Sequence, residues 1–363
     1  MSEVVKTPSV LMVGPSLTSR GGMATVEKQL VDCLPREGID VDFLSTYEDA
    51  SKLRKAFVAI RAYFAFCRNV DRYDIVHVHM ASRASYERKA IFIRHASKRG
   101  KRVIIHHHGA EFGTWYDAEL NDAKKTEIRD VFARADGVIV LSEEWLDWFT
   151  ARGFCVDSFI VMHNAVSMPE ASCSPGLHQD ILFLGRLDER KSPDVLMRAA
   201  MKTLEEHPES RLVFGGDGLL ERYKALALDL GIDQRCEFLG WTTGEDKEQL
   251  FQRAGVYCLP SKNEGMPMSV LEAMAHGIPT VATPVGGVPQ IIDDGGNGFI
   301  IPVDDEAALS SILCRLADSS ELRSMIGNAG RKTVKRGFNI ERNVVKLAEL
   351  YRRLAYSERG VDG

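Results

Sequence analysis

Two glutamates in the second half of the chain, Glu264 and Glu272, lie on either side of a predicted helix start. The apolar run 255–260 predicts a buried strand that ends at its proline. A helix is predicted to begin near Pro267, because the first helical position does not need the N–H that proline lacks, and to stop at Gly277. We therefore expect Glu264 in the loop after the strand and Glu272 on the helix.

The start of this predicted helix can hold an anion. Backbone N–H groups near Met268 and Ser269 have no partner within the helix and point out of its end. A carboxylate then lies on each side of the anion. This suits a ligand with hydroxyls on both sides of its phosphates, such as a sugar nucleotide. Two glutamates at this spacing also occur as solvated helix charges. The surrounding sequence must therefore distinguish a ligand site from a solvated helix surface.

Two cations, Arg186 and Lys191, follow the predicted strand 181–184. Arg186 is expected at the carboxyl end of that strand, and Lys191 just before the next helix. An arginine fork and a lysine point charge that converge there can neutralise a diphosphate. An isolated arginine and lysine also fit a solvated loop, so they need support from the same context.

Short apolar strands alternate with helical stretches in both halves of the 363-residue chain. This alternation predicts the α/β class, with parallel sheets covered by helices on both faces. The strands predicted in the first half are 9–14, 41–44, 75–79, 102–106, 137–141 and 159–162. The strands predicted in the second half are 181–184, 212–215, 236–239, 256–259, 280–282 and 299–301. Ligands of such sheets lie beyond the carboxyl ends of the strands, so two facing sheets are expected to form one cleft.

The order of these motifs resembles the donor-site signature of retaining glycosyltransferases of family 4. Segment 260–277 has that family's Pro-Ser, Glu-Gly and Glu-Ala-Met-Ala, and segment 185–191 has its Gly-Arg-Leu followed by lysine. Ser192 stands where the family usually has glycine. The resemblance extends from Val10 to about Leu354. It implies the GT-B fold, in which two Rossmann-like, doubly wound domains face a central cleft.

The resemblance also implies how the chain divides. Residues 1–166 are expected to form the acceptor-binding domain, and residues 179–337 the domain that binds a nucleotide-sugar donor. A linker, 167–178, is expected between them. Residues 338–363 are expected to form a C-terminal helix that crosses back to the first domain.

The same resemblance implies the site residues. Arg186 and Lys191 are expected to bind the donor phosphates and stabilise the leaving group. Glu264 is expected to contact the hydroxyls of the donor sugar, and Glu272 the ribose diol. His108 matches a family histidine near the transferred sugar. The implied catalytic residues are His108, Arg186, Lys191 and Glu264. The implied donor-binding residues are Gly22, Arg186, Lys191, Gly240, Gly265, Met266, Met268, Ser269 and Glu272.

Two features of the first half are less specific. The glycine pair 21–22 lies between the first strand and the first helix, where backbone can approach a phosphate, but it also suits any tight turn. It lacks the G-x-G-x-x-G spacing of a dinucleotide site. His77 and His79 share a face of the third strand. His79 is expected either to contact the acceptor or to be a buried, hydrogen-bonded histidine.

No metal site and no other cofactor is expected. His106, His107 and His108 are consecutive, but neighbours on a strand point to opposite faces, so the three cannot easily converge on one ion. The Asp-x-Asp pattern at 40–42 matches metal-dependent glycosyltransferases. It lies on an early strand of the first half, and we interpret it as chance.

A basic tract covers residues 52–102, with 14 Lys and Arg against three Asp and Glu. Its net charge of +11 contrasts with −5 for the whole chain. Apolar residues recur in the tract at helical spacing: Leu53, Phe57, Ile60 and Phe64. One interpretation is a core-facing stripe with solvated charges. The other is a surface for anionic lipid or a lipid-diphosphate acceptor, to which each basic residue contributes about 1 kcal/mol.

Composition restricts the location and the partners. The chain has no run of 18 apolar residues and no apolar core near its start of the kind that a signal peptide has. It is therefore expected to be cytoplasmic, either unattached or peripheral at the cytoplasmic face of a membrane. The net charge of −5 gives no reason to expect a nucleic-acid partner.

The resemblance implies metal-independent, retaining transfer of a hexose-type sugar from a nucleotide-diphosphate sugar to an acceptor hydroxyl. The favoured acceptor is a carbohydrate or lipid-linked glycan, as in polysaccharide synthesis at the inner membrane face. Two alternatives stay open: a sugar-nucleotide epimerase of similar twin-Rossmann plan, and a non-catalytic nucleotide-sugar-binding partner. The second alternative is opposed by the intact set of motif residues: Arg186, Lys191, Glu264 and Glu272.

Overall fold

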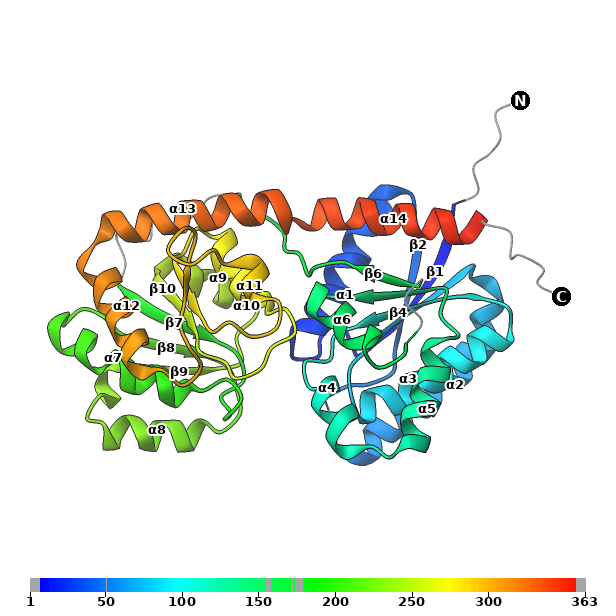
Figure 1. Cartoon of the computed structure of the whole chain (residues 1–363), viewed down its shortest axis with the longest axis horizontal. Coiled ribbons are helices and arrows are strands. Elements are labelled where there is room, and N and C mark those ends of the chain that lie inside the picture. The colour runs from blue at the N-terminus through cyan, green and yellow to red at the C-terminus, as the bar shows by residue number, and fades with distance from the viewer. Residues whose placement is uncertain (1–6, 50, 155–157, 171–172, 174–178, 357–363) are drawn as a thin grey trace, which may run out of the picture. The chain divides into compact units, whose positions relative to one another are not determined.

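The computed structural model describes residues 7–356 apart from residue 50 and the stretches 155–157, 171–172 and 174–178. Much of the predicted linker 167–178 therefore lies outside the described residues. The chain divides into two compact units (Figure 1). The first comprises the described residues of Met1–Asn164 and Ile340–Gly363, and the second those of Ala165–Asn339.

The first unit is built on a parallel six-stranded sheet with the order β2-β1-β3-β4-β5-β6. Its strands are β1 (Ser9–Gly14), β2 (Asp40–Ser45), β3 (Ile75–Met80), β4 (Arg102–His107), β5 (Gly137–Val140) and β6 (Phe159–Val161). Its helices are α1 (Gly22–Cys33), η1 (Leu34–Glu37), α2 (Lys52–Asn69), η2 (Val70–Arg72), α3 (Ala84–Lys98), α4 (Phe112–Thr114), η3 (Trp115–Glu119), α5 (Asp122–Phe132), α6 (Glu143–Thr150) and α14 (Ile340–Tyr356).

Alternate residues of β3 face different layers of the first unit. Val76 and Val78 belong to the apolar core, together with Tyr86 of α3. His77 faces the other way, and its Nδ1 lies 2.5 Å from the hydroxyl of Tyr351 on α14. Helices cover both faces of the sheet, so every residue of β3 is buried.

The second unit repeats this plan with the strand order β12-β11-β10-β7-β8-β9, again parallel. Its strands are β7 (Asp180–Leu184), β8 (Leu212–Gly215), β9 (Cys236–Gly240), β10 (Ala254–Leu259), β11 (Thr280–Ala282) and β12 (Phe299–Ile300). Its helices are α7 (Pro193–Glu206), α8 (Leu220–Asp229), η5 (Asp233–Arg235), α9 (Gly244–Arg253), α10 (Met268–Ala275), α11 (Val288–Ile291), α12 (Glu306–Asp318) and α13 (Ser320–Gly337). The predicted α/β class with two doubly wound sheets is confirmed.

The C-terminal helix α14 is part of the first unit. It packs against α1, η1 and β3 through one apolar face. The buried residues of that face are Ile340, Val344, Leu347, Ala348, Leu350, Tyr351 and Leu354. Two hydrogen bonds fix its ends, from Asn343 to the His163 carbonyl at 2.6 Å and from Arg352 to the Glu37 carbonyl. The first unit is therefore assembled from both ends of the chain.

Candidate active site

A buried ion pair joins the loops that follow β7 and β10, which are neighbours in the second sheet. Lys191 Nζ lies 2.6 Å from Glu264 Oε1, and these side chains are only 11% and 8% exposed. Arg190 adds a second cation: its Nη1 donates to Glu264 Oε1 at 3.3 Å and to the Asn263 carbonyl at 2.8 Å. The motifs predicted Lys191 and Glu264 as site residues, but they gave no sign of Arg190.

The cations keep Glu264 ionised. Burial would raise the pKa of this carboxyl, but the charges of Lys191 and Arg190 and the hydrogen bond from Lys191 outweigh burial and lower that pKa. An ionised carboxylate accepts hydrogen bonds from hydroxyls. The Lys191 ammonium has three donors, so it can serve this carboxylate and a phosphate oxygen together.

The turn that presents Lys191 is tight. The N–H groups of Lys191 and Ser192 both donate to the Asp188 carbonyl at 3.2 Å. Ser192 has a φ of +49° and a ψ of +49°, a left-handed conformation that favours glycine. This explains why the resembled motif usually has glycine at this position. Here the Ser192 hydroxyl donates to the Glu189 carbonyl at 3.3 Å.

Arg186 follows β7 directly, as predicted, but its side chain extends towards solvent. It is 68% exposed, and its Nε lies 4.0 Å from Asp188 Oδ2. Gly185 precedes it, and a side-chain carbon there would come within 3.4 Å of Lys191 Cε. The convergence of Arg186 and Lys191 on one diphosphate stays a prediction.

The helix that carries Glu272 begins at Met268, next to Pro267, as the sequence predicted. Pro267 has a ψ of 117° and forms the N-cap, so it precedes the first helical residue. Gly277 follows the helix with a φ of +81°, in agreement with the predicted stop. Because the first N–H groups of a helix have no intrahelical acceptor, those of Met268 and Ser269 lie at its open end.

A second turn holds the loop before α10. Gly287 N–H donates to the Gly265 carbonyl at 2.6 Å. Gly286 beside it has a φ of +55°, and a side-chain carbon there would come within 2.1 Å of the Glu264 carbonyl oxygen. Met266 is buried under this turn, where its methyl carbon is close to Gly287. The predicted donor residues of this loop are thus part of a fixed backbone arrangement.

Glu272 also has a cationic partner that the sequence did not reveal. Lys247 of α9 lies with its Nζ 2.6 Å from Glu272 Oε2, and the carboxylate side chain is 15% exposed. The hydroxyl of the buried Tyr257 on β10 donates to the Leu184 carbonyl at 3.3 Å. Gly240, the last residue of β9, has a φ of +71°. The predicted donor residues of the second unit therefore lie on the ends of β7, β9 and β10 and on α10.

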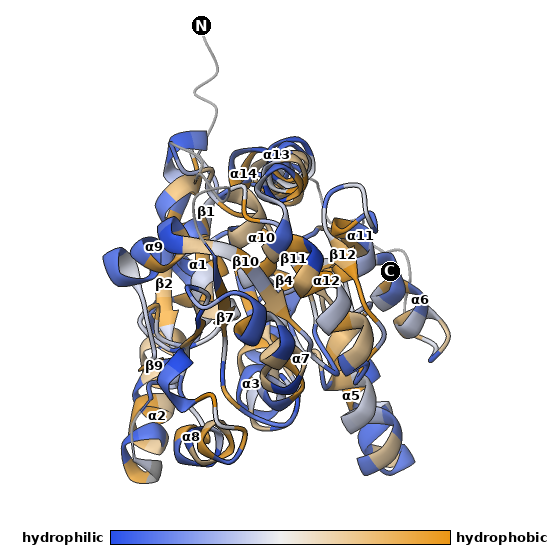
Figure 2. Cartoon of the chain, turned by 90° about the vertical axis from the view of Figure 1, so that its left-hand side faces the viewer, coloured by the Kyte–Doolittle hydropathy of each residue, from blue (hydrophilic) through white to orange (hydrophobic). Residues whose placement is uncertain are grey.

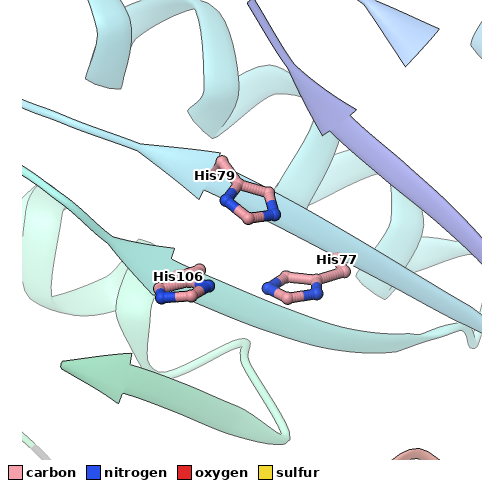
Figure 3. A group of neighbouring side chains, drawn as sticks. All are labelled: His77, His79 and His106. Carbon is pink, nitrogen blue, oxygen red and sulfur yellow. The ribbon is translucent and has the colours of Figure 1, made fainter. Parts of the chain in front are cut away.

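Four histidines gather on one face of the first sheet. Strand register places His79 of β3 beside His106 of β4. Ring centroids lie 4.5 Å apart for His77 and His79 and 4.2 Å apart for His106 and His108. Nδ1 of His79 lies 2.9 Å from Nε2 of His108, so the structure brings these two predicted site residues together. Figure 3 shows His77 and His79 on one strand and His106 on the next.

His107 points to the opposite face, as predicted for neighbours on a strand. Its ring contacts Phe112, Trp145 and Phe149, with centroids 4.7, 4.9 and 5.2 Å away. The three consecutive histidines therefore do not surround one ion. Candidate metal ligands instead come from two strands: one nitrogen from each of His77, His79 and His106 lies within 4.8 Å of the others.

Burial keeps this histidine cluster neutral at pH 7. It lowers the pKa of His77 to about 3 and that of His108 to about 3. It also lowers the pKa of His79 and that of His106. His108, predicted to be catalytic, can therefore serve as a hydrogen-bonding group at neutral pH and not as an acid.

Two ionisable side chains are buried near the histidine cluster, and burial raises the pKa of one of them, Glu27. Glu27 of α1 is 0% exposed, and its Oε1 lies 3.9 Å from His79 Nδ1. Gly14 leaves room for it, since a side-chain carbon there would lie 1.9 Å from that oxygen. Lys89 of α3 donates to the Thr46 hydroxyl at 2.5 Å, and burial lowers its pKa to about 7. Counting Lys89 among the surface cations of the basic tract was therefore wrong.

Two further predicted features lie at the start of the first unit. Gly22 is the first residue of α1, and Gly21 before it has a φ of +121°. The glycine pair thus lies between the first strand and the first helix, as expected. Asp42 of the Asp-x-Asp pattern accepts a hydrogen bond from the Tyr73 hydroxyl at 2.7 Å, which gives it a role within the fold.

Helix α2 carries an apolar stripe that is exposed to solvent. Figure 2 shows that α2 contains both hydrophobic and hydrophilic residues. The members of this α2 stripe are 86%, 64%, 59% and 60% exposed, and in that order they are Leu53, Phe57, Ile60 and Phe64. Contact with the core is made instead by Ala62 and Phe66. The interpretation of the stripe as core-facing is therefore wrong.

Cations accompany the α2 stripe. Arg54, Arg61 and Arg68 of α2 are exposed. Arg54 lies 3.4 Å from Glu48, and several other arginines of the basic tract are also paired with acids, so the net charge of +11 overstates the charge available to a partner. These pairs are Arg83–Glu111, Arg94–Glu127, Arg99–Asp71 and Arg102–Asp136. Within the described part of the chain, no helix has the length and apolar character needed to cross a membrane.

Two family models match the chain. The model described as glycosyl transferases group 1 matches residues 172–333, and the one described as glycosyltransferase family 4 matches residues 20–168. EpsD of Bacillus subtilis, named provisionally as a glycosyltransferase, is 30% identical over 77% of this chain and 76% of its own length. The chain belongs to glycosyltransferase family 4.

Other relatives of this family 4 chain differ in how much of it they cover. The UDP-Gal:alpha-D-GlcNAc-diphosphoundecaprenol alpha-1,3-galactosyltransferase of Escherichia coli is 26% identical over 91% of this chain and 93% of its own length. The D-inositol 3-phosphate glycosyltransferase of Saccharomonospora viridis is 34% identical over 50% of this chain, and the match spans only 44% of that relative.

Solved structures share the fold of this family 4 chain. Sucrose-phosphate synthase of Thermosynechococcus elongatus aligns with a TM-score of 0.77 at 19% identity, over 96% of this chain and 99% of its own. HepE of Anabaena in complex with UDP-glucose aligns with a TM-score of 0.73 at 16% identity, over 94% and 98%. The predicted GT-B fold is thus confirmed.

Proposed function

We propose that this chain is a retaining glycosyltransferase that moves a hexose-type sugar from a nucleotide-diphosphate sugar to an acceptor hydroxyl. The observation that carries the proposal is the Lys191–Glu264 pair, with Arg190 on the same carboxylate, at the carboxyl ends of β7 and β10. Parallel α/β sheets bind ligands at this edge. The pair offers a carboxylate for sugar hydroxyls and an ammonium for phosphate oxygens.

In the proposed reaction the bond between the sugar and the diphosphate breaks, and the acceptor oxygen forms its bond on the same face of the sugar. The leaving diphosphate takes the proton of the acceptor hydroxyl, so no protein nucleophile is needed. Lys191, Arg186 and the N–H groups at the start of α10 stabilise the charge that develops on the diphosphate. These groups take the part that a divalent ion has in other glycosyltransferases, so the transfer is proposed to need no metal.

Within the donor site, Glu264 is proposed to bind the sugar hydroxyls and Glu272 the ribose diol. Gly22, Gly240 and the loop at Gly265 are proposed to supply backbone contacts. In the first unit, His108 is proposed to contact the transferred sugar, and the buried His79 to hold the ring of His108 through their hydrogen bond. The neutral ring of His108 suits hydrogen bonds to hydroxyls.

The acceptor is proposed to be a lipid-linked glycan presented at an anionic membrane surface on the cytoplasmic side. Two observations support this: the α2 stripe is exposed, and cations of the same helix flank it. An amphipathic helix of this kind lies in the membrane interface with its apolar side chains among the lipids. The Escherichia coli relative that aligns over 91% of the chain is named for a diphosphoundecaprenol-linked acceptor.

The decisive experiment screens nucleotide sugars by thermal shift, since a ligand of the folded state raises Tm. The best donor is then incubated with lipid-diphosphate acceptors, and the anomeric configuration of the product is read by NMR. A product with retained configuration is expected. The rate of its formation should be the same in EDTA as in buffer that contains Mg²⁺. An epimerised nucleotide sugar formed without acceptor identifies an epimerase. Binding without any turnover identifies a non-catalytic partner.

A further inference from the structure

The histidine cluster of the first unit leaves several polar atoms unsatisfied. Among the described residues, His77 Nε2, His79 Nε2 and both ring nitrogens of His106 have no hydrogen-bond partner. Each of these side chains is buried, at 0%, 0% and 3% exposure. Buried polar groups are almost always hydrogen-bonded, so a cluster of unpartnered nitrogens points to a bound species.

The other ring nitrogens show how the unpartnered ones can be free of protons. If His77 donates its Nδ1 proton to the Tyr351 hydroxyl 2.5 Å away, its Nε2 presents a lone pair. If His79 donates its Nδ1 proton to His108 Nε2 at 2.9 Å, its Nε2 does the same. Such outer hydrogen bonds are the usual means by which proteins fix the tautomer of a metal-binding histidine.

We propose that His77, His79 and His106 form a binding site for a divalent transition-metal ion of the Zn²⁺ type. Imidazole nitrogens suit Zn²⁺ and its neighbours, whereas Mg²⁺ and Ca²⁺ require oxygen ligands. The candidate ligand nitrogens lie within 4.8 Å of one another. In tetrahedral coordination they would be about 3.3 Å apart, at Zn–N distances of about 2.0–2.1 Å. The rings of His77 and His79 now stack at 22°, so binding requires them to rotate.

Glu27 is the carboxyl that would balance the charge of the ion. Three neutral imidazoles leave the charge of a divalent ion uncompensated in a buried site, which is costly unless an anion lies nearby. Glu27 is fully buried, its Oε1 lies 3.9 Å from His79 Nδ1, and neither of its oxygens has a hydrogen-bond partner among the described residues. The proposed ion lies within the first unit and has no part in the diphosphate chemistry of the second.

The test measures metal directly and does not use turnover. The full chain, purified without a histidine tag, is loaded with Zn²⁺ and dialysed, and its metal content is measured by mass spectrometry. We expect about one Zn²⁺ per chain, and close to none in the double variant His77→Gln, His106→Gln. His107→Gln is the matched control, because it changes the next buried histidine of β4 on the opposite face and should keep the ion. His207→Gln controls for binding at the surface.

A second measurement on the unaltered chain covers the case in which the double variant fails to fold. Co²⁺ in place of Zn²⁺ should give the visible absorption of tetrahedral coordination, and Zn²⁺ should shift the side-chain nitrogen resonances of His77, His79 and His106. The proposal is overturned if the loaded chain retains no stoichiometric metal. It is also overturned if a folded double variant retains as much as the unaltered chain, or if the shifted resonances belong to other histidines.

Discussion

The two units hold their polar groups in opposite ways. In the second unit, Lys191 and Glu264 carry opposite charges and form an ion pair between the loops that follow β7 and β10. In the first, His77, His79 and Glu27 are fully buried, and several of their polar atoms lack a partner among the described residues. A satisfied charge pair can release its ligand after each reaction. Unsatisfied buried groups keep a desolvation cost that favours a permanent occupant.

The largest expected effect concerns the Lys191–Glu264 ion pair of the second unit. Lys191→Ala removes a donor to the leaving diphosphate, so turnover should fall about 10²–10³-fold, equivalent to about 2.7–4 kcal/mol. Product formation gives kcat, and thermal melting checks the fold. Lys262→Ala is the matched control, since Lys262 lies in the neighbouring loop after β10 but pairs with the half-exposed Asp304 at 2.7 Å. Near-normal turnover of Lys191→Ala would remove Lys191 from the chemistry.

A slightly smaller effect is expected on membrane binding, which we attribute to helix α2 of the first unit and not to the second unit. Replacing Arg54, Arg61 and Arg68 by Gln should weaken binding to anionic vesicles about 100-fold, at about 1 kcal/mol per basic residue. Binding should also fall as salt rises, while hydrolysis of the donor is unchanged.

The apolar part of the membrane surface has its own variant. Leu53→Ser with Phe57→Ser should weaken vesicle binding and leave the fold intact, because both side chains are more than 60% exposed. Leu228→Ser on α8 of the second unit is the control, since Leu228 is 66% exposed but belongs to no such stripe. A chain that ignores anionic vesicles at low salt has a soluble acceptor.

The two glutamates of the second unit should differ in what they bind. Glu272→Ala should weaken binding of the free nucleoside diphosphate by about 10–100-fold, because a hydrogen bond to a charged group contributes about 1.5–3 kcal/mol. Glu264→Ala should leave that affinity unchanged and reduce affinity for the intact nucleotide sugar. Isothermal titration of both ligands separates the two roles. Equal loss of diphosphate affinity in both variants would contradict the assignment.

The smallest effect concerns stability and pH. The folded-state pKa of Glu264 is lowered, so its ionised form stabilises the fold at pH above its unfolded value of about 4.3. That stabilisation is lost as the pH falls through the lower folded-state pKa. The Tm difference between the unaltered chain and Glu264→Gln should therefore be positive at pH 7 and shrink below about pH 4.

The control for this pH dependence is Glu306→Gln. Glu306 pairs with Arg198, but its side chain is 42% exposed, so solvent screens the pair. Its Tm difference should be small at every pH. If the Tm difference between the unaltered chain and Glu264→Gln stays constant down to pH 3, the carboxylate is not held ionised by its neighbours.

The sequence predicted most of the fold, because each buried parallel strand is a short apolar run. The predicted strand 75–79 corresponds to β3, which ends one residue later, and 212–215 coincides with β8. The helix expected to start near Pro267 begins at Met268 with Pro267 as its N-cap, since proline is compatible with the N-cap as well as with the first helical turn. Differences of this size follow from local backbone geometry that residue type alone does not determine.

Candidate site residues could be recognised from the sequence where a single loop carries each motif. Lys191 and Glu264 lie in recognisable motifs, whereas the contact of Arg190 with Glu264 depends on how two separate loops pack. The histidine cluster depends on the register that puts His79 beside His106, which no local pattern encodes. Helical spacing likewise could not say which way the α2 stripe faces, because Ala62 and Phe66 form a second apolar face.

The attachment of α14 to the first unit has a consequence for synthesis of the chain. The ribosome completes residue 164 of this unit long before it reaches Ile340, and at about 5–20 residues per second the interval is roughly 10–40 s. During that time the surfaces of α1 and β3 that pack against α14 in the folded chain lack this helix. The second unit, continuous from Ala165 to Asn339, can finish within the interval. The part of the chain made first is thus completed last, and nascent first units are the natural clients of a chaperone.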